Sequence, residues 1–420
     1  MAPTLANTER PIRDWKAPSA AQAQNGALRE ELDRIELFVA GAGRISKEEA
    51  LFLHNNADLL SLGRMATSVR LRKNPEARIT YIVDRNLNPT NVCITDCGFC
   101  AFYRSPGDRQ AYVLSRDEIY QKVEDTVRLG GKQLLMQGGH HPNVLSDFWC
   151  ELISDIKARF DINCHALSAP EIEHFARYEK RPIAEVIADL KEAGLGSLPG
   201  AGAEVLVERV RKIIAPKKTT TDDWLEVHRQ THKTGLRSSA TMMYGNVETV
   251  AERIEHLVRL RDLQDETGGF TAFASWNTQP EGVPQEELFP RTTTPAEYLR
   301  VQSIARIFLD NFDHMQTSYV TQGMKMSQVS LAFGCDDFGG TMLEENVVSA
   351  AGCFHLESIQ RIESLIRNAG YQPLQRNSWY GIEDERNDGQ TWPKNREEAA
   401  THPGAPDDMR TAARASRPTA

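Results

Sequence analysis

The sequence predicts an α/β fold, a (β/α)8 barrel of the TIM type with an N-terminal helical extension and disordered tails. Short apolar runs alternate with segments of helical period, eight such runs can be counted, and most of them end in glycine, proline or small polar residues. Strict alternation predicts a parallel sheet with right-handed crossovers, and eight units close a barrel. An open doubly wound sheet is the alternative. No Gly-x-Gly-x-x-Gly follows the first strand, which weakens the nucleotide-binding form of that alternative.

Composition narrows the class of protein. The 420 residues are 40% hydrophobic and 25% charged, as in ordinary globular proteins. A net charge of −9 suggests neither a nucleic-acid nor an anionic-membrane partner. We expect no membrane span and no apolar leader. Seven cysteines, three of them clustered, argue against a secreted disulfide framework and predict a cytoplasmic protein.

The chain divides into four predicted parts. Residues 1–25 lack periodicity and are expected to be disordered. Residues 26–78 form the helical extension, in which Ser46 and Glu49 have the spacing of a capping box. Residues 79–380 form the barrel. Residues 381–420 are almost devoid of apolar side chains and are expected to be a disordered tail.

The barrel elements follow in order along the chain. The predicted strands are 79–83, 132–137, 161–167, 196–198, 236–244, 269–276, 315–320 and 331–334. The main predicted helices are 115–129, 148–160, 186–192, 221–234, 249–266, 295–309 and 355–369.

Three cysteines, Cys93, Cys97 and Cys100, follow the first predicted strand with the spacing Cys-x3-Cys-x2-Cys. Thiolates this close on one loop can bind one soft metal centre. A cubane iron–sulfur cluster held by three cysteines keeps one iron free for an outside ligand. Three cysteines within eight residues are hard to explain by packing alone. A structural zinc site normally has four ligands, and the nearest histidines, His140 and His141, could complete one only through the fold.

Other strand ends are expected to face this loop, because the chemistry of such barrels lies at the C-terminal ends of the strands. Two glycines after Gln137 allow a ligand close to the backbone, and a plain tight turn is the alternative. The glycine-rich loop 199–204 opens a helix and could dock an anionic group or a ribose. An aromatic face and polar groups after the sixth strand suit an aromatic or nucleoside-like substrate, namely Trp276, Gln279 and Glu281.

The cysteine motif, with Phe99 before its last cysteine, resembles that of the radical S-adenosylmethionine (SAM) enzymes. The resemblance is closest in 88–93, 97–104 and 264–270, which look like the branch holding the futalosine-pathway enzymes of menaquinone biosynthesis and the deazaflavin (FO) synthase subunits. Within that branch, 276–281 is most similar to the cyclases of dehypoxanthinylfutalosine. Ala274 and Ser275 depart from the Ile-Pro pair that is common there.

The resemblance implies two cofactors, a [4Fe–4S] cluster on the three cysteines and SAM on its open iron. It places Phe99 near the adenine of SAM, Gln137, Gly138 and Gly139 near the methionine amino group, and Glu204 near the ribose or the amino-acid end. It also implies an external one-electron reductant of the flavodoxin or ferredoxin type.

The implied reaction is the cyclisation of dehypoxanthinylfutalosine. A 5′-deoxyadenosyl radical takes a hydrogen from the ribose, the ribose radical adds to the benzoate ring, and an electron and a proton are lost. Glu281, His140 and Asp336 are the candidates for accepting this proton. The alternatives are an aminofutalosine synthase, an FO synthase subunit, and, in another class, a non-catalytic iron–sulfur or zinc protein.

Overall fold

The computed structural model describes residues 22–289, 293–355 and 357–383. The predicted disorder of residues 1–21 and 384–420 lies outside this part of the chain. Helix α1 already begins at Gln22, and Ile382 forms a β-bridge with Arg376.

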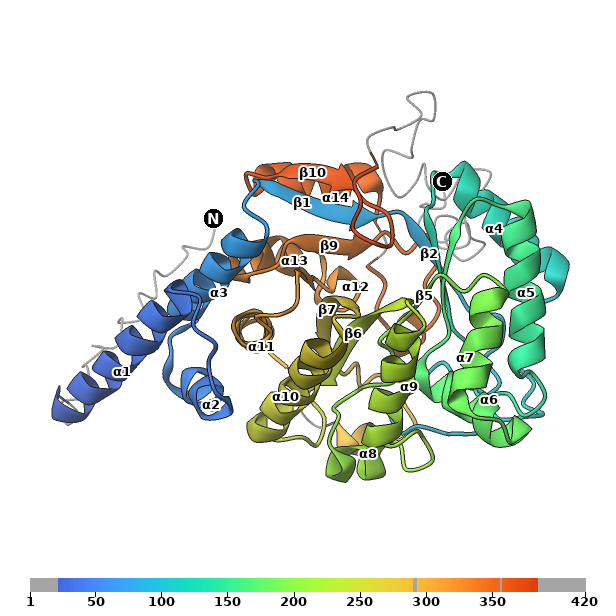
Figure 1. The fold of residues 1–420 in the computed structure, drawn as a ribbon, viewed down its shortest axis with the longest axis horizontal. Coiled ribbons are helices and arrows are strands. Elements are labelled where there is room, and N and C mark those ends of the chain that lie inside the picture. Colours follow the sequence, from blue (N-terminus) through green and yellow to red (C-terminus); the bar gives the residue numbers. More distant parts are fainter. Residues whose placement is uncertain (1–21, 290–292, 356, 384–420) are drawn as a thin grey trace, which may run out of the picture.

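A parallel sheet of ten strands forms the centre of the molecule (Figure 1). Its order is β10-β1-β9-β8-β7-β6-β5-β4-β3-β2. The strands are β1 Arg78–Ile82, β2 Asp84–Leu87, β3 Gln133–Met136, β4 Asn163–Ala166, β5 Ser197–Leu198, β6 Arg237–Tyr244, β7 Phe270–Asn277, β8 His314–Gln316, β9 Asp337–Gly340 and β10 Gln372–Gln375.

The sheet curls into a partial barrel. Strands β1 and β2 are separated only by Val83, yet they lie near opposite ends of the sheet order. Strand β1 pairs with β9 and β10, whereas β2 pairs with β3. Backbone hydrogen bonds from Lys132 to Val83 and from Leu343 to Asp84, both 2.9 Å long, link the two sides of this segment. The predicted TIM-like α/β class is therefore confirmed.

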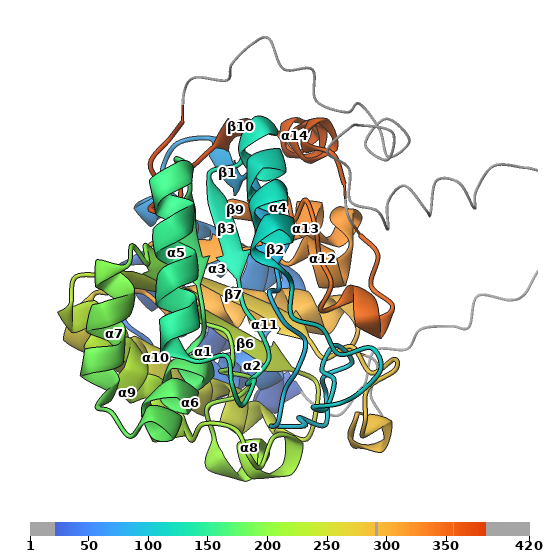
Figure 2. The same ribbon diagram turned by 90° about the vertical axis from the view of Figure 1, so that its right-hand side faces the viewer.

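Helices cover the outer face of the sheet (Figures 1 and 2). Their bounds are α1 Gln22–Ala40, α2 Lys47–Asn56, α3 Leu59–Lys73, α4 Arg116–Arg128, α5 Ser146–Arg159, α6 Ala169–Glu179, α7 Ile183–Glu192, α8 Glu208–Ile214, α9 Thr221–Lys233, α10 Val250–Thr267, α11 Pro295–Phe308, α12 Tyr319–Gln322, α13 Met324–Ser330 and α14 Ile359–Asn368. The capping box at Ser46 and Glu49 is formed, with reciprocal hydrogen bonds of 3.1 and 2.8 Å.

The structure corrects several predicted elements. Residues 331–333 form a 3-10 helix rather than a strand, and the true strand, β9, follows at Asp337. β9 is polar because Asp337 faces the barrel interior, where it pairs with Arg376. The strand predicted at 315–320 ends at Gln316, and Tyr319 begins α12. Strands β2 and β10 and helices α6, α12 and α13 were not predicted, and the helix expected after the glycine-rich loop is α8, which begins at Glu208.

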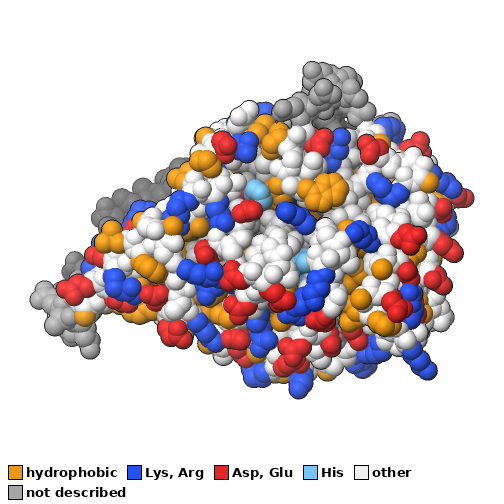
Figure 3. Space-filling model, in the orientation of Figure 1, with side chains coloured by type: hydrophobic (Ala, Val, Ile, Leu, Met, Phe, Trp, Pro, Cys, Tyr) orange, Lys and Arg blue, Asp and Glu red, His pale blue; other side chains and the backbone are white. Residues whose placement is uncertain are grey.

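The surface matches the composition. Figure 3 shows acidic and basic side chains interspersed over one face of the molecule. None of the helices in the described part of the chain combines the length and the hydropathy that a membrane span requires.

Candidate active site

The cysteine loop follows β2, and hydrogen bonds within the loop hold its conformation. The amide of Cys93 donates to the carbonyl of Arg104 (2.9 Å), and the amide of Arg104 donates to that of Asn91 (2.8 Å). The Arg104 guanidinium donates to the carbonyls of Ala101 (3.0 Å) and Tyr103 (2.8 Å). One arginine thus fixes the turn that carries the last cysteine.

The three cysteines of this loop are free thiols, and Cys100 lines the cavity inside the sheet. Cys93 and Cys97 are buried, and Cys100 is half-buried. The hydroxyl oxygen of Thr95 lies 2.9 Å from Sγ of Cys93 and 3.7 Å from Sγ of Cys97. Burial raises the pKa of the Cys97 thiol to about 12 and also raises that of Cys100. The positive charge of a bound metal centre would offset the cost of forming these thiolates.

The donor set suits a cluster better than a single ion. In residues 22–289, 293–355 and 357–383, no three His, Cys, Asp or Glu side chains converge on one point where a metal ion could be held. In a cubane each thiolate binds a different iron, so the three sulfurs need not meet.

Two glycines bring the end of β3 against the cysteine loop. A Cβ at Gly139 would lie 2.1 Å from the carbonyl oxygen of Val92 and 2.9 Å from Cβ of Cys93. The Gly139 amide donates to the Thr90 carbonyl (3.1 Å). The amide of the preceding Gly138 donates to the carboxylate of Glu171 (2.9 Å). Glycine at 139 is therefore required for close approach to the cluster loop.

Glu204, at the end of the glycine-rich loop, carries two cationic neighbours. Its carboxylate lies 2.8 Å from Nζ of Lys218 and 3.3 Å from the guanidinium of Arg211. Its backbone has φ 43°, a left-handed conformation that is strained for a residue other than glycine. Lys218 also lies 5.4 Å from the ring centroid of Phe99. Phe99, Glu204 and Lys218 thus gather beside the cysteines.

A cavity of about 370 Å³ occupies the inside of the curled sheet. Six of the predicted site residues line it, namely Phe99, Cys100, Gln137, Glu204, Trp276 and Gln279. Its opposite end is lined by Arg376, Ser378 and Tyr380, which follow β10. The Asn163 side chain at the start of β4 donates to the Ser378 hydroxyl (2.8 Å), so this segment closes the N-terminal end of the barrel.

The three residues predicted to accept a proton do not line this cavity. Glu281 is exposed in a turn. His140 is buried against His174, with ring centroids 5.0 Å apart. Asp336 binds the imidazole of His314 (2.6 Å) and the amide of Met315 (2.7 Å) on the N-terminal side of the sheet. Proximity to a strand end in the sequence does not determine whether a side chain points into the cavity.

Three charged residues of the cavity, Asp84, Glu345 and Arg376, were missed by sequence reasoning. Asp84 directly follows the apolar run 79–83 and is buried, and a carboxylate at the end of a predicted buried strand was a detectable signal. Arg376 is the one Lys or Arg among the described lining residues. It follows β10, whose Gln-Pro-Leu-Gln sequence carries little strand signal.

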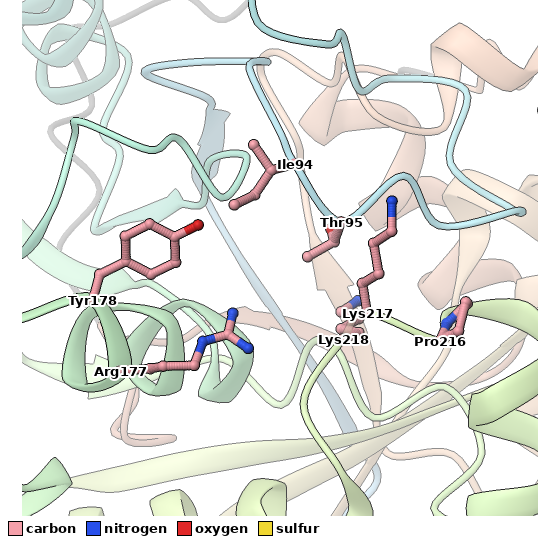
Figure 4. Close-up of a pocket in the computed structure, with 7 residues that line it drawn as sticks. All are labelled: Ile94, Thr95, Arg177, Tyr178, Pro216, Lys217 and Lys218. Carbon is pink, nitrogen blue, oxygen red and sulfur yellow. The ribbon is translucent and has the colours of Figure 1, made fainter. Parts of the chain in front are cut away.

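A second hollow, of about 650 Å³, lies on the outer side of the cysteine loop (Figure 4). Ile94 and Thr95 of the loop line it, facing Arg177 and Tyr178 of α6 and the segment 216–218. Lys217 is exposed there and lies 2.7 Å from the carboxylate of Asp96. The cysteine loop is thus bordered by a cavity on one side and, on the other, by an open hollow whose charged lining residues are all basic.

A curled parallel sheet with a three-cysteine loop at the mouth of its cavity defines an enzyme class, the radical SAM enzymes. The sequence model of the radical SAM superfamily matches residues 87–260, and that of the CofH/MqnC C-terminal region matches residues 267–388. The chain belongs to the radical SAM superfamily and, within it, to the CofH/MqnC family.

Three curated relatives place it further. It is 47% identical over 346 residues to the cyclic dehypoxanthine futalosine synthase of Streptomyces coelicolor, covering 81% of this chain and 86% of that protein. It is 42% identical over 352 residues to the synthase of the same name from Halalkalibacterium halodurans, covering 84% and 95%. It is 38% identical over 343 residues to the aminodeoxyfutalosine synthase of Thermus thermophilus, covering 80% and 92%.

Solved structures share the fold at low identity. The FeFe-hydrogenase maturase HydG from Carboxydothermus hydrogenoformans aligns with a TM-score of 0.67 and 16% identity, covering 90% of this chain and 85% of that one. Methylornithine synthase (PylB) aligns with a TM-score of 0.62 and 15% identity, covering 80% and 96%.

Proposed function

We propose that this protein is a radical SAM cyclase that converts dehypoxanthine futalosine to cyclic dehypoxanthine futalosine in menaquinone biosynthesis. The observation that carries the proposal is the 47% and 42% identity to two synthases of that name, each over more than four-fifths of the chain. The identity to an aminodeoxyfutalosine synthase is lower, at 38%. The geometry supports it, since Cys100 of the three-cysteine loop lines a mainly apolar cavity inside the curled sheet together with Phe99 and Glu204.

Cys93, Cys97 and Cys100 would hold a [4Fe–4S] cluster and leave one iron for the amino and carboxylate groups of SAM. The three cysteines lie on one loop that backbone hydrogen bonds hold in place, which supports this assignment. Gly139 supports it too, because the absence of a side chain there lets the loop lie against the end of β3. When bound, the cluster and SAM supply the one-electron chemistry that removes a hydrogen atom from the substrate.

The residues beside Cys100 would bind SAM. The Phe99 ring lines the cavity and offers a face to the adenine. Gln137, Gly138 and Gly139 would border the methionine amino group. Glu204 would accept a hydrogen bond from a ribose hydroxyl, while Lys218 and Arg211 balance its charge in the buried site.

Trp276 and Gln279 would position the nucleoside-like substrate. Both line the cavity at the C-terminal end of β7. The Gln279 side chain is oriented by two hydrogen bonds, one donated to the carbonyl of Asn277 (3.0 Å) and one accepted from the thiol of Cys353 (3.1 Å). A fixed amide and an aromatic face are suited to a sugar and a benzoate ring respectively.

An external reductant of the flavodoxin or ferredoxin type would approach from the outer hollow. Thr95 lines that hollow, and its hydroxyl lies 2.9 Å from Sγ of Cys93, so the cluster loop is thin on this side. Arg177 and Lys217 give the hollow basic groups that would attract an acidic protein.

The test is a comparison of substrates. Anaerobically reconstituted and reduced protein with SAM is given dehypoxanthine futalosine, or instead the carboxyvinyl-oxybenzoate used by an aminofutalosine synthase. We expect turnover of the first, giving a product lighter by two hydrogen atoms. Cys97→Ala should abolish it. Turnover of the carboxyvinyl-oxybenzoate alone would contradict the proposal.

A further inference from the structure

The cavity of about 370 Å³ is lined by three carboxylates, of which two are engaged. Glu204 lies between Lys218 and Arg211. Glu345 accepts backbone hydrogen bonds at both oxygens, from Val347, Val348 and Ser349, at 2.8 to 3.0 Å. The third, Asp84, makes no ion pair with any residue that the structure describes.

Asp84 is held rigidly in the wall. It is the first residue of β2 and only 2% exposed. Its amide donates to the Thr341 hydroxyl (3.2 Å), and its carbonyl accepts from the amide of Leu343 (2.9 Å). The backbone therefore cannot swing the carboxyl group away from the cavity.

The carboxyl group itself is lightly bonded. Oδ1 accepts from the amide of Met342 (2.9 Å), and Oδ2 accepts only a long bond of 3.4 Å from the Gln133 side chain. A Cβ at Gly340 would lie 2.3 Å from Oδ2 and 2.4 Å from Oδ1. The glycine thus provides the space that the carboxyl group occupies, and Oδ2 keeps hydrogen-bonding capacity.

The charged and titratable neighbours do not neutralise it. The guanidinium of Arg376 is already engaged by both oxygens of Asp337, at 2.5 and 3.0 Å. Tyr319 of α12 donates its hydroxyl to the carbonyl of Thr341 (2.7 Å). Burial is the largest cause that raises the pKa of Asp84 to about 6, opposed by the Met342 amide and Arg376. At neutral pH the group is an ionised carboxylate with more basicity than an exposed one.

We propose that Asp84 is the general base that removes the proton from the cyclised aromatic ring. This rests on the proposed function. Bond formation between the ribose carbon and the benzoate ring leaves a hydrogen on the ring carbon that was attacked. That C–H bond breaks, its proton moves to a carboxylate oxygen of Asp84, and its electron pair restores the aromatic ring. The one surplus electron leaves to a one-electron acceptor of the iron–sulfur class.

The test is Asp84→Asn, which keeps an oxygen for the Met342 amide but cannot hold the proton. Because proton loss comes after hydrogen abstraction, the variant should still form 5′-deoxyadenosine from SAM. Cyclised product should fall about 10²- to 10⁴-fold, the usual contribution of a general base. The ratio of the two products, which we expect to be near one in the wild type, separates this role from a structural one. Asp84→Ser, a smaller side chain, should give the same ratio.

Binding supplies a readout without turnover. Calorimetric affinity of the unreduced protein for dehypoxanthine futalosine should stay within about threefold in Asp84→Asn. Asp161→Asn makes the same chemical change at an exposed position before β4 and is the control for both readouts.

The outcomes are distinct. Product formation by Asp84→Asn at the wild-type ratio would overturn the role of Asp84, and so would equal losses of 5′-deoxyadenosine and of product. A loss of substrate affinity would assign Asp84 to binding and overturn it as well. If the wild type itself forms no cyclised product, the proposed function fails, and the role of Asp84 fails with it.

Discussion

Gly139→Ala should loosen the cluster site without unfolding the barrel. The added methyl carbon would lie 2.1 Å from the carbonyl oxygen of Val92 and 2.9 Å from Cβ of Cys93. A carbon–oxygen contact normally needs about 3.3 Å, so the loop and the strand end must separate by roughly 1 Å. The obstacle is a backbone oxygen, which cannot rotate away as a side chain would.

Such overpacking costs about 1–3 kcal/mol, which lowers the equilibrium for cluster binding about 5- to 150-fold. The assay is iron and sulfide per chain, with visible absorption, after anaerobic reconstitution. Gly138→Ala is the matched control, because its Cβ would lie 3.2 Å from the Thr90 side chain and at an ordinary contact distance of 3.5 Å from the nearest backbone atom, the Thr90 carbonyl oxygen. Far-ultraviolet circular dichroism should be the same for both variants. A full iron complement in Gly139→Ala, equal to that of Gly138→Ala, would refute the reasoning.

Three further predictions concern the loop, the cavity wall and the substrate. Arg104→Lys loses a guanidinium that reaches two loop carbonyls through Nη1 and the Gln110 side chain through Nε, so a chelator should remove iron faster than from wild type; an unchanged rate would contradict this. Asp84→Asn should raise the free energy of unfolding at pH 8 by about 3 kcal/mol, measured in urea, because the carboxyl pKa rises from 3.8 to about 6 on folding. Above pH 6 the carboxylate is charged, and its burial destabilises the folded protein. The gain in free energy of unfolding from Asp84→Asn should therefore shrink as the pH falls below 6. A gain that grows in acid would contradict this prediction. Trp276→Leu should raise KM for dehypoxanthine futalosine up to about tenfold, because an aromatic contact contributes about 1.5 kcal/mol to binding. An unchanged KM would show that Trp276 does not contact the substrate.

Local patterns in the sequence were enough to predict the cysteine loop and the alternation of strands and helices. The loop is recognised from three cysteines close together in the sequence and from the glycines that allow another strand end to approach it. Gln137, Trp276 and Gln279 were found because parallel strand ends gather at one edge of a barrel. The direction of a side chain at such an edge is not local, which is why Glu281 and Asp336 were placed in the site.

The closed end of the cavity depends on pairing across the whole chain. Strand β10 pairs with β1 about three hundred residues away, and only this pairing brings Arg376 to Asp337. Lys218 reaches Glu204 by a similar return of the chain after α8. Neither contact leaves a periodic pattern in the sequence. A carboxylate directly after an apolar run is different, because burying it costs free energy, and Asp84 could have been singled out on that ground.

The most direct test of the central claim follows a hydrogen atom from the substrate. Reduced protein with SAM is given dehypoxanthine futalosine carrying deuterium on the ribose carbon that forms the new bond. The account predicts that 5′-deoxyadenosine gains one deuterium for each cyclised product formed. Cyclised product with unlabelled 5′-deoxyadenosine, or labelled 5′-deoxyadenosine without any cyclised product from the wild type, would contradict it.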